Sequence, residues 1–234
     1  MPNTNSGFLT RLRADGSAVV ASTFLFRDNL SGTAPHLALD AADNPYVLAA
    51  TFDALAPTPG CLAAGEVFVA KFDPSLQRQL LLARTELRFG LGVNAFEVDE
   101  CENVHLAGVS YDNIPIVNPL PNSPTTITPN SSIARMFSLT LDARLARWTF
   151  GSFFGSLGHA HGRARFDKQG RLYANACVIN GAGFPTTPGA YAATTRSGNA
   201  RKDVVAYVLD QGTGPGPVVR AVTPAVPRAV PRTK

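Results

Sequence analysis

The stretch LALDAADNPYVLAA, residues 37–50, decides the fold because it recurs twice further along the chain. It aligns without gaps with FEVDECENVHLAGV at 96–109 and with ARFDKQGRLYANAC at 164–177. Each copy has an apolar run, an Asp that opens a short polar turn, and a second apolar run. An Asp in that place accepts hydrogen bonds from the backbone N–H groups ahead of it. Each copy therefore predicts a β-hairpin.

A strand that ends in a charged residue is the second repeated element. Its copies are GFLTRLRAD (7–15), VFVAKFDPS (67–75), MFSLTLDAR (136–144) and VVAYVLDQG (204–212). Their apolar residues alternate, as in a half-buried strand. Further apolar runs follow the first three copies, at 18–26, 79–85 and 146–154. The acids of both repeated elements are Asp40, Asp99, Asp167, Asp73, Asp142 and Asp210.

The two elements agree on a period of about 60 residues, since Asp40 lies 59 residues before Asp99 and Asp99 lies 68 before Asp167. Four antiparallel strands per repeat at this spacing are typical of a propeller blade. The sequence therefore predicts an all-β fold, a partial β-propeller of about three four-stranded antiparallel blades plus the first strand of a fourth. An open β-sandwich is the alternative, although it would not explain a four-strand period repeated in register.

The repeats also predict how the chain is divided. The expected units are blades at 7–65, 66–132 and 133–202, a strand of an incomplete fourth repeat at 203–211, and a Pro-rich basic tail at 212–234. We expect the fourth-repeat strand to add to the edge of a neighbouring sheet. Known propellers have about four to eight blades. Further blades from the same or another chain are therefore expected as partners.

The composition excludes several classes of protein. A content of 45% hydrophobic and 16% charged residues is that of a globular chain. No apolar run is long enough to cross a membrane, and the N-terminus lacks the apolar segment of a signal peptide. The net charge of +4 is too sparsely distributed to predict nucleic-acid binding. The three cysteines, without a CxxC motif, predict neither a disulfide framework nor a zinc knuckle.

Metal ligands are few. Repeated turn acids can bind Ca²⁺, but each turn here offers one or two carboxylates where Ca²⁺ requires about six to eight oxygens. Capping of the turns is therefore the expected role of these acids. His159 and His161 alternate along the chain and, with Cys177 or His105, would suffice chemically for a Zn²⁺ site. Polar loop histidines are the alternative, and no cofactor is expected.

No motif predicts catalysis. The chain has no G-x-S-x-G elbow, no phosphate loop, and no Ser, His and Asp in a context that suggests a triad. Aromatic side chains that could line a sugar-binding surface are instead expected mainly in the core: Trp148, Phe150, Phe153 and Phe154. Strand alternation assigns a second group of aromatic residues to the core: Phe8, Phe68, Phe72, Phe137 and Phe166.

Together these pieces resemble the SBBP β-propeller repeat, with its strand ending in Asp, its D-x-x-G-N-x-Y-V hairpin and its closing FPTTPGA. Here the hairpins read DAADNPYV, DECENVHL and DKQGRLYA, and FPTTPGAY stands at 184–191. The third repeat is similar to the last repeats of large surface proteins in type IX-secreting, gliding bacteria. The resemblance implies a secreted or cell-surface, adhesion-type module that is no enzyme and acts as a scaffold or binds protein or glycan. A propeller-fold polysaccharide hydrolase or lyase and a non-functional fragment are the alternatives.

Overall fold

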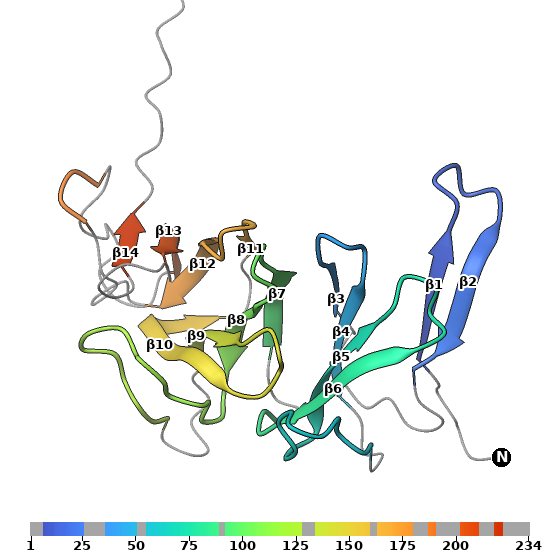
Figure 1. The fold of residues 1–234 in the computed structure, drawn as a ribbon. Helices are drawn as coiled ribbons and strands as arrows, with labels where there is room; N and C mark the ends of the chain where they lie inside the picture. Colours follow the sequence, from blue (N-terminus) through green and yellow to red (C-terminus); the bar gives the residue numbers. More distant parts are fainter. Residues whose placement is uncertain are drawn as a thin grey trace, which may run out of the picture.

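All regular structure in the described part of the chain is β-strand (Figure 1). The computed structural model describes residues 7–25, 36–50, 55–88, 92–127, 134–159, 163–179, 187–190, 202–210 and 218–221. All pairs between named strands are antiparallel, so the predicted all-β, antiparallel fold is confirmed. Among these residues no helix is long and apolar enough to span a membrane.

A two-stranded hairpin comes first, formed by β1 (Phe8–Leu12) and β2 (Val19–Phe24). A four-stranded sheet follows, which we call the first sheet. Its strands, in both chain order and spatial order, are β3 (His36–Leu39), β4 (Pro45–Ala50), β5 (Val67–Phe72) and β6 (Gln79–Thr85).

Two more groups of four strands follow. The second sheet contains β7 (Gly92–Val98), β8 (Val104–Ser110), β9 (Ala134–Leu141) and β10 (Trp148–His159). The third sheet contains β11 (Ala164–Phe166), β12 (Leu172–Ile179), β13 (Lys202–Asp210) and β14 (Val218–Ala221). The pairs Gly158–Val178 and His159–Cys177 connect β10 to β12 and join these two sheets into one of eight strands.

The sheets are offset from the sequence repeats. Each sheet takes its first two strands from the end of one repeat and its last two from the start of the next. The fourth-repeat strand β13 adds to a neighbouring sheet by pairing with β12, as expected. It is not the last strand of that sheet, because residues 218–221, within the predicted tail, form β14 and pair with its other side.

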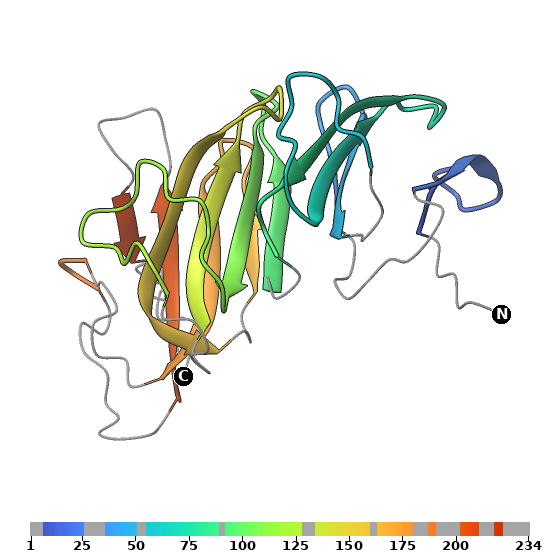
Figure 2. The same cartoon turned by 90° about the horizontal axis from the view of Figure 1, so that it is seen from below.

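The sheets pack face to face, in chain order. Three apolar clusters fill the interfaces: one between the hairpin and the first sheet, one between the first and second sheets, and one between the second and third sheets. Figures 1 and 2 place the hairpin and β14 at opposite ends of this stack. The first strands lie together, since β7 contacts both β3 and β11.

Most of the predicted core residues are buried. Phe68, Phe72, Phe137 and Phe166 are each less than 9% exposed, and so are Trp148, Phe150, Phe153 and Phe154. Phe8 is the exception, since 68% of its surface is exposed and its assignment to the core is wrong. The alternation of β1 is as expected, but no described sheet covers the face that carries Phe8.

Candidate functional site

The three repeated Asp hairpins have one turn geometry. The Oδ1 atom of Asp40 accepts hydrogen bonds from the backbone N–H groups of Ala42 and Asn44, both at 2.9 Å. Asp99 and Asp167 accept the same pair of bonds from the residues two and four positions ahead. The residue three positions after each Asp has a positive φ, between 60° and 76°. The predicted turn capping is thus confirmed for these three acids.

The acids that follow the third strands cap a second kind of turn. Asp73 accepts backbone hydrogen bonds from Gln77 and Arg78, and Asp142 accepts them from Ala146 and Arg147. Asp210 ends β13, and the residues directly after it lie outside the described part. In the five described turns, the carboxylates expected from sequence are therefore hydrogen-bonded to their own turns.

A buried lysine connects the first sheet to the second. Lys71 Nζ lies 3.0 Å from Asp40 Oδ2 in its own sheet and 2.8 Å from Glu102 Oε2 in the turn of the second sheet. It also lies 5.0 Å from the centre of the Tyr46 ring. Burial lowers the pKa of this ammonium, but hydrogen bonds to Glu102, Tyr46 and Asp40 outweigh that effect and raise the pKa. Lys71 is therefore charged and joins two turns.

In the second sheet a buried His105–Thr140 pair takes the place of the Tyr46–Lys71 pair. His105 Nε2 lies 2.9 Å from Asp99 Oδ2, and His105 Nδ1 lies 3.0 Å from Thr140 Oγ1. The strand pairs Tyr46–Lys71 and His105–Thr140 are equivalent, as both join the sixth residue after the turn Asp to the neighbouring strand. Burial opposes ionisation of Asp99, but bonds from His105 and Asn103 lower its pKa overall.

The order Asp99, His105, Thr140 is also that of a carboxylate–histidine–hydroxyl catalytic relay. Sequence reasoning did not bring these residues together, although their repeated spacing carries the signal. All three are at most 9% exposed. The Phe166 ring lies 5.1 Å from the imidazole, and Gly170 packs so closely that an added Cβ would lie 2.7 Å from His105 Cε1. The third sheet thus covers the relay, which is the geometry of a packed interface.

Lys168 connects the turn regions of all three sheets. Its Nζ atom lies 3.0 Å from Glu97 Oε1 and 3.3 Å from the backbone oxygens of Leu39 and Val98. In addition, the backbone N–H of Glu100 donates to the carbonyl of Lys168 at 3.0 Å. These bonds hold the turns at one end of the first strands, where the chain presents a surface of mixed charge.

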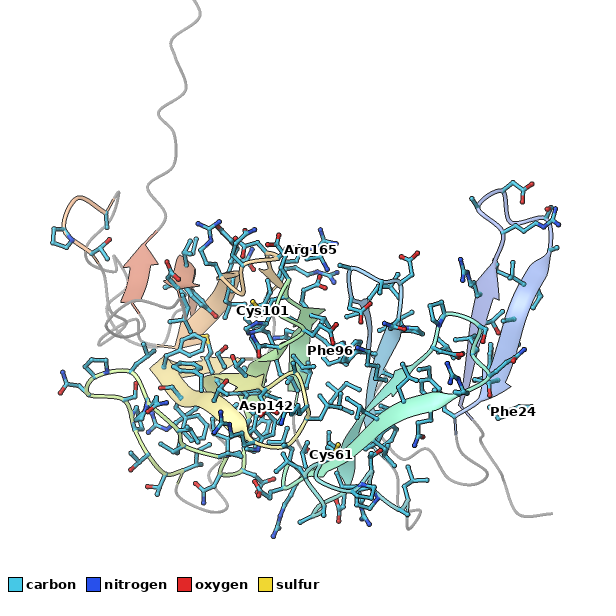
Figure 3. All side chains as sticks on the ribbon, in the orientation of Figure 1. Phe24, Cys61, Phe96, Cys101, Asp142 and Arg165 are labelled. Atoms are coloured by element: carbon cyan, nitrogen blue, oxygen red, sulfur yellow. The ribbon has the colours of Figure 1, made fainter. Side chains whose placement is uncertain are left out.

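The outward face of the third sheet is exposed and polar. It carries Arg165 and Tyr173, which lie opposite each other in the strand register, together with Asn175. Tyr173 is 43% exposed, whereas Tyr46 and His105, at the same place in the other two sheets, are buried under a following sheet. Figure 3 shows Arg165 near the turn end of the third sheet. Tyr and Arg are enriched among residues that dominate binding energy at interfaces.

The predicted zinc ligands are only partly covered by the described residues. His159 and Cys177 face each other in the register of β10 and β12, which the sequence did not show. Their side chains and the whole of His161 lie outside the described part. Within the described residues, no group of three or more His, Cys, Asp and Glu side chains is placed to hold a metal ion. The zinc hypothesis stays a prediction.

Comparison with known proteins leaves the family open. No protein-family model matches the chain, and no curated protein matches its sequence. The similarity to SBBP repeats therefore stays a prediction from the motifs.

Proposed function

We propose that this chain is a non-catalytic, propeller-type repeat module of an exported bacterial surface protein, acting as a scaffold and binding protein or glycan. One observation carries the proposal: the same Asp turn recurs in three stacked sheets and uses its carboxylate for hydrogen bonds within the turn. Such carboxylates support a rigid stack. Export and cell-surface location rest on the resemblance of the motifs.

The outward face of the third sheet is the proposed binding surface. Tyr173 and Arg165 offer an aromatic ring and a guanidinium side by side, and Asn175 adds an amide. An exposed aromatic ring can stack on a sugar or enter a pocket of a protein partner, and Arg is a frequent companion of such residues. The buried equivalents in the other sheets serve packing, so of these three described positions only that of Tyr173 is exposed.

The test is binding of the full chain to glycan and protein arrays, followed by variants. Tyr173→Ser should weaken binding to any ligand found by at least about tenfold, which is about 1.4 kcal/mol. Tyr111→Ser is the matched control, because Tyr111 is 44% exposed in a loop after β8. Equal loss in both variants, or binding to neither array, would contradict the proposed surface.

A hydrolase is the second candidate, and the Asp99–His105–Thr140 relay is the observation that favours it. Release of ester-linked acyl groups from polysaccharides, abolished by Thr140→Val at unchanged thermal stability, would establish that function and overturn the non-catalytic proposal. Covalent labelling of Thr140 by a fluorophosphonate would do the same. We expect neither, because the relay is covered by Phe166 and Gly170.

A further inference from the structure

The β1–β2 hairpin corresponds to the last two strands of each complete sheet. In the aligned segments Phe8 matches Phe68 and Phe137, and Leu12 matches Phe72 and Leu141. The matching residues in the sheets are at most 7% exposed, whereas Phe8 and Leu12 are 68% and 54% exposed. The hairpin is therefore half of a sheet.

The edge of β1 is the place where the other half would pair. Within the described residues β1 pairs only with β2, while β5, β9 and β13 each also pair with the second strand of an Asp hairpin. The register is the same in all three sheets, since the sixth residue after the turn Asp lies opposite Lys71, Thr140 or Val208. On β1 the equivalent position is Arg11.

A second exposed apolar surface lies where the other two strands of the hairpin's sheet would pack. Leu37 and Leu39 of β3 are 56% and 45% exposed on the face directed toward the hairpin side. Their equivalents in β7 are Phe96 and Val98. Phe96 packs against the apolar cluster between the first and second sheets, and Val98 is fully buried in that cluster. Figure 3 shows Phe96 between the first and second sheets. An added pair of strands beside β1 would cover Leu37 and Leu39 in the same way.

The charges fit as well. Arg11 occupies the position of Lys71, which bridges the turn Asp of its own sheet and Glu102 of the next. The residue equivalent to Glu102 in the first sheet is Asp43, which is exposed. A hairpin that paired with β1 would place its turn Asp near Arg11, with Asp43 on the other side. Arg11 would then join two turn acids in the way that Lys71 joins Asp40 and Glu102.

We propose that β1 binds, through strand addition, a β-hairpin of the same Asp-turn type that is none of the three in this structure. Those three hairpins are already built into sheets, in this copy of the chain and equally in a second one. Strand addition at an open edge is a common mode of peptide recognition. The added hairpin completes the fourth four-stranded sheet and covers Phe8, Leu12, Leu37 and Leu39. This inference does not depend on the proposed binding face of the third sheet.

The test uses a fluorescein-labelled peptide with the sequence of the chain's own hairpin, residues 36–50, and the full chain. We expect saturable binding, with hydrogen exchange of the β1 amides slowed at least about tenfold. A Val47→Pro peptide should bind at least about tenfold more weakly, because proline cannot donate to a ladder. Arg11→Met should weaken binding of the unchanged peptide, whereas the matched control Arg13→Met should not.

A fused form keeps the test decisive if the free peptide does not fold. The same hairpin joined to the N-terminus by a Gly/Ser linker has a millimolar effective concentration. Unchanged exchange at β1 in this fusion would overturn the proposal, as would equal binding of the Val47→Pro peptide. Protection of β1 that grows with protein concentration and without any peptide would show that a second copy pairs with this edge, and would also overturn it.

Discussion

At one end of the stack the hairpin exposes Phe8, Leu12 and Phe24, whereas at the other end the third sheet exposes Arg165, Tyr173 and Asn175. Within the described residues, both ends have a neighbouring sheet on one side only. Figure 3 shows Phe24 at the extreme end of the hairpin, far from Arg165. The same repeat therefore presents an apolar surface at one end and a polar surface at the other.

The difference is one of surface chemistry. Repeat arrays need end units with a polar outer face, and the third sheet has such a face whereas the hairpin has an apolar one. Burying a Phe or Leu side chain contributes about 1.5–3 kcal/mol, and the hairpin leaves this contribution unused at three positions. The hairpin end is thus the one that gains by acquiring a partner.

Truncating equivalent phenylalanines should have the largest effect. Phe68→Ala should lower the free energy of unfolding by about 3–5 kcal/mol, because it leaves a cavity between the hairpin and the first sheet. Phe8→Ala should cost less than about 1 kcal/mol, since Phe8 is mostly exposed. Urea denaturation of both variants measures the difference. Similar losses would mean that Phe8 is covered in solution and that the hairpin end is not open.

Removing equivalent positive charges comes next. Lys71→Met should destabilise the chain by about 3 kcal/mol, because it leaves the buried Asp40 carboxylate without its counter-charge. Arg11→Met should change stability by at most about 0.5 kcal/mol, because Arg11 is exposed. Thermal denaturation at neutral pH checks both. A near-neutral Lys71→Met would show that the turn hydrogen bonds alone satisfy Asp40.

Two glycines with similar backbone angles allow a substitution at a sheet interface to be compared with one at the exposed hairpin end. Gly170 (φ 76°) packs against His105, whereas Gly16 (φ 71°) in the hairpin turn has nothing within 4 Å of an added Cβ. Gly170→Ala should cost about 2 kcal/mol through backbone strain and displacement of the imidazole. Gly16→Ala should cost about 1 kcal/mol through strain alone. Equal losses in chemical denaturation would show that the contact with His105 adds nothing.

The sequence predicted the strands and turns because their signals are local. Alternation and the recurring Asp are enough to place the hairpins and the capping role of Asp40, Asp99 and Asp167. Which strands share a sheet depends on pairing between distant segments, and the repeat period alone does not determine where a sheet begins. Phe8 was misplaced for the same reason, since alternation indicates a face but not whether another sheet covers it. Residues 218–221 were assigned to the tail because the prolines and glycines around them obscure a four-residue strand.

The site was predictable only in part. The acids are visible in the sequence, but their connection through Lys71 or through His105 and Thr140 requires the strand register. The leucines at the positive-φ positions of the second turn type, Leu76 and Leu145, gave no turn signal. Glycine is the usual residue in such a conformation. Both side chains are buried, and that burial offsets the backbone strain.

Acid should affect the three sheets more than the hairpin. The pKa values of Asp40, Asp99 and Asp167 are lowered, because hydrogen bonds to the ionised forms outweigh burial. A lowered folded-state pKa contributes stability above the unfolded value of about 4, and this stability is lost as the pH falls through the folded value. We expect a loss on the order of 1 kcal/mol between about pH 5 and 3. In Asp99→Asn this pH dependence should be smaller. Hydrogen bonds from Ser17 also lower the pKa of Asp15 in the hairpin turn, but this acid is exposed and its bonds are open to solvent. Hydrogen exchange that accelerated first in the hairpin at low pH would contradict the expected order.

The smallest effect on stability, and the most direct comparison of the two ends, comes from Phe24→Ser and Tyr173→Ser. Both side chains are exposed, at 75% and 43%, so each variant should keep its unfolding free energy within about 0.5 kcal/mol. Sedimentation over a range of concentrations should show weak self-association of the unaltered chain through the exposed apolar side chains of the hairpin, with no added protection of the β1 amides. Phe24→Ser should reduce that association and Tyr173→Ser should not. If Tyr173→Ser reduced it instead, the third sheet would be the adhesive end, and the exposed hairpin face would not be an unfinished half of a sheet.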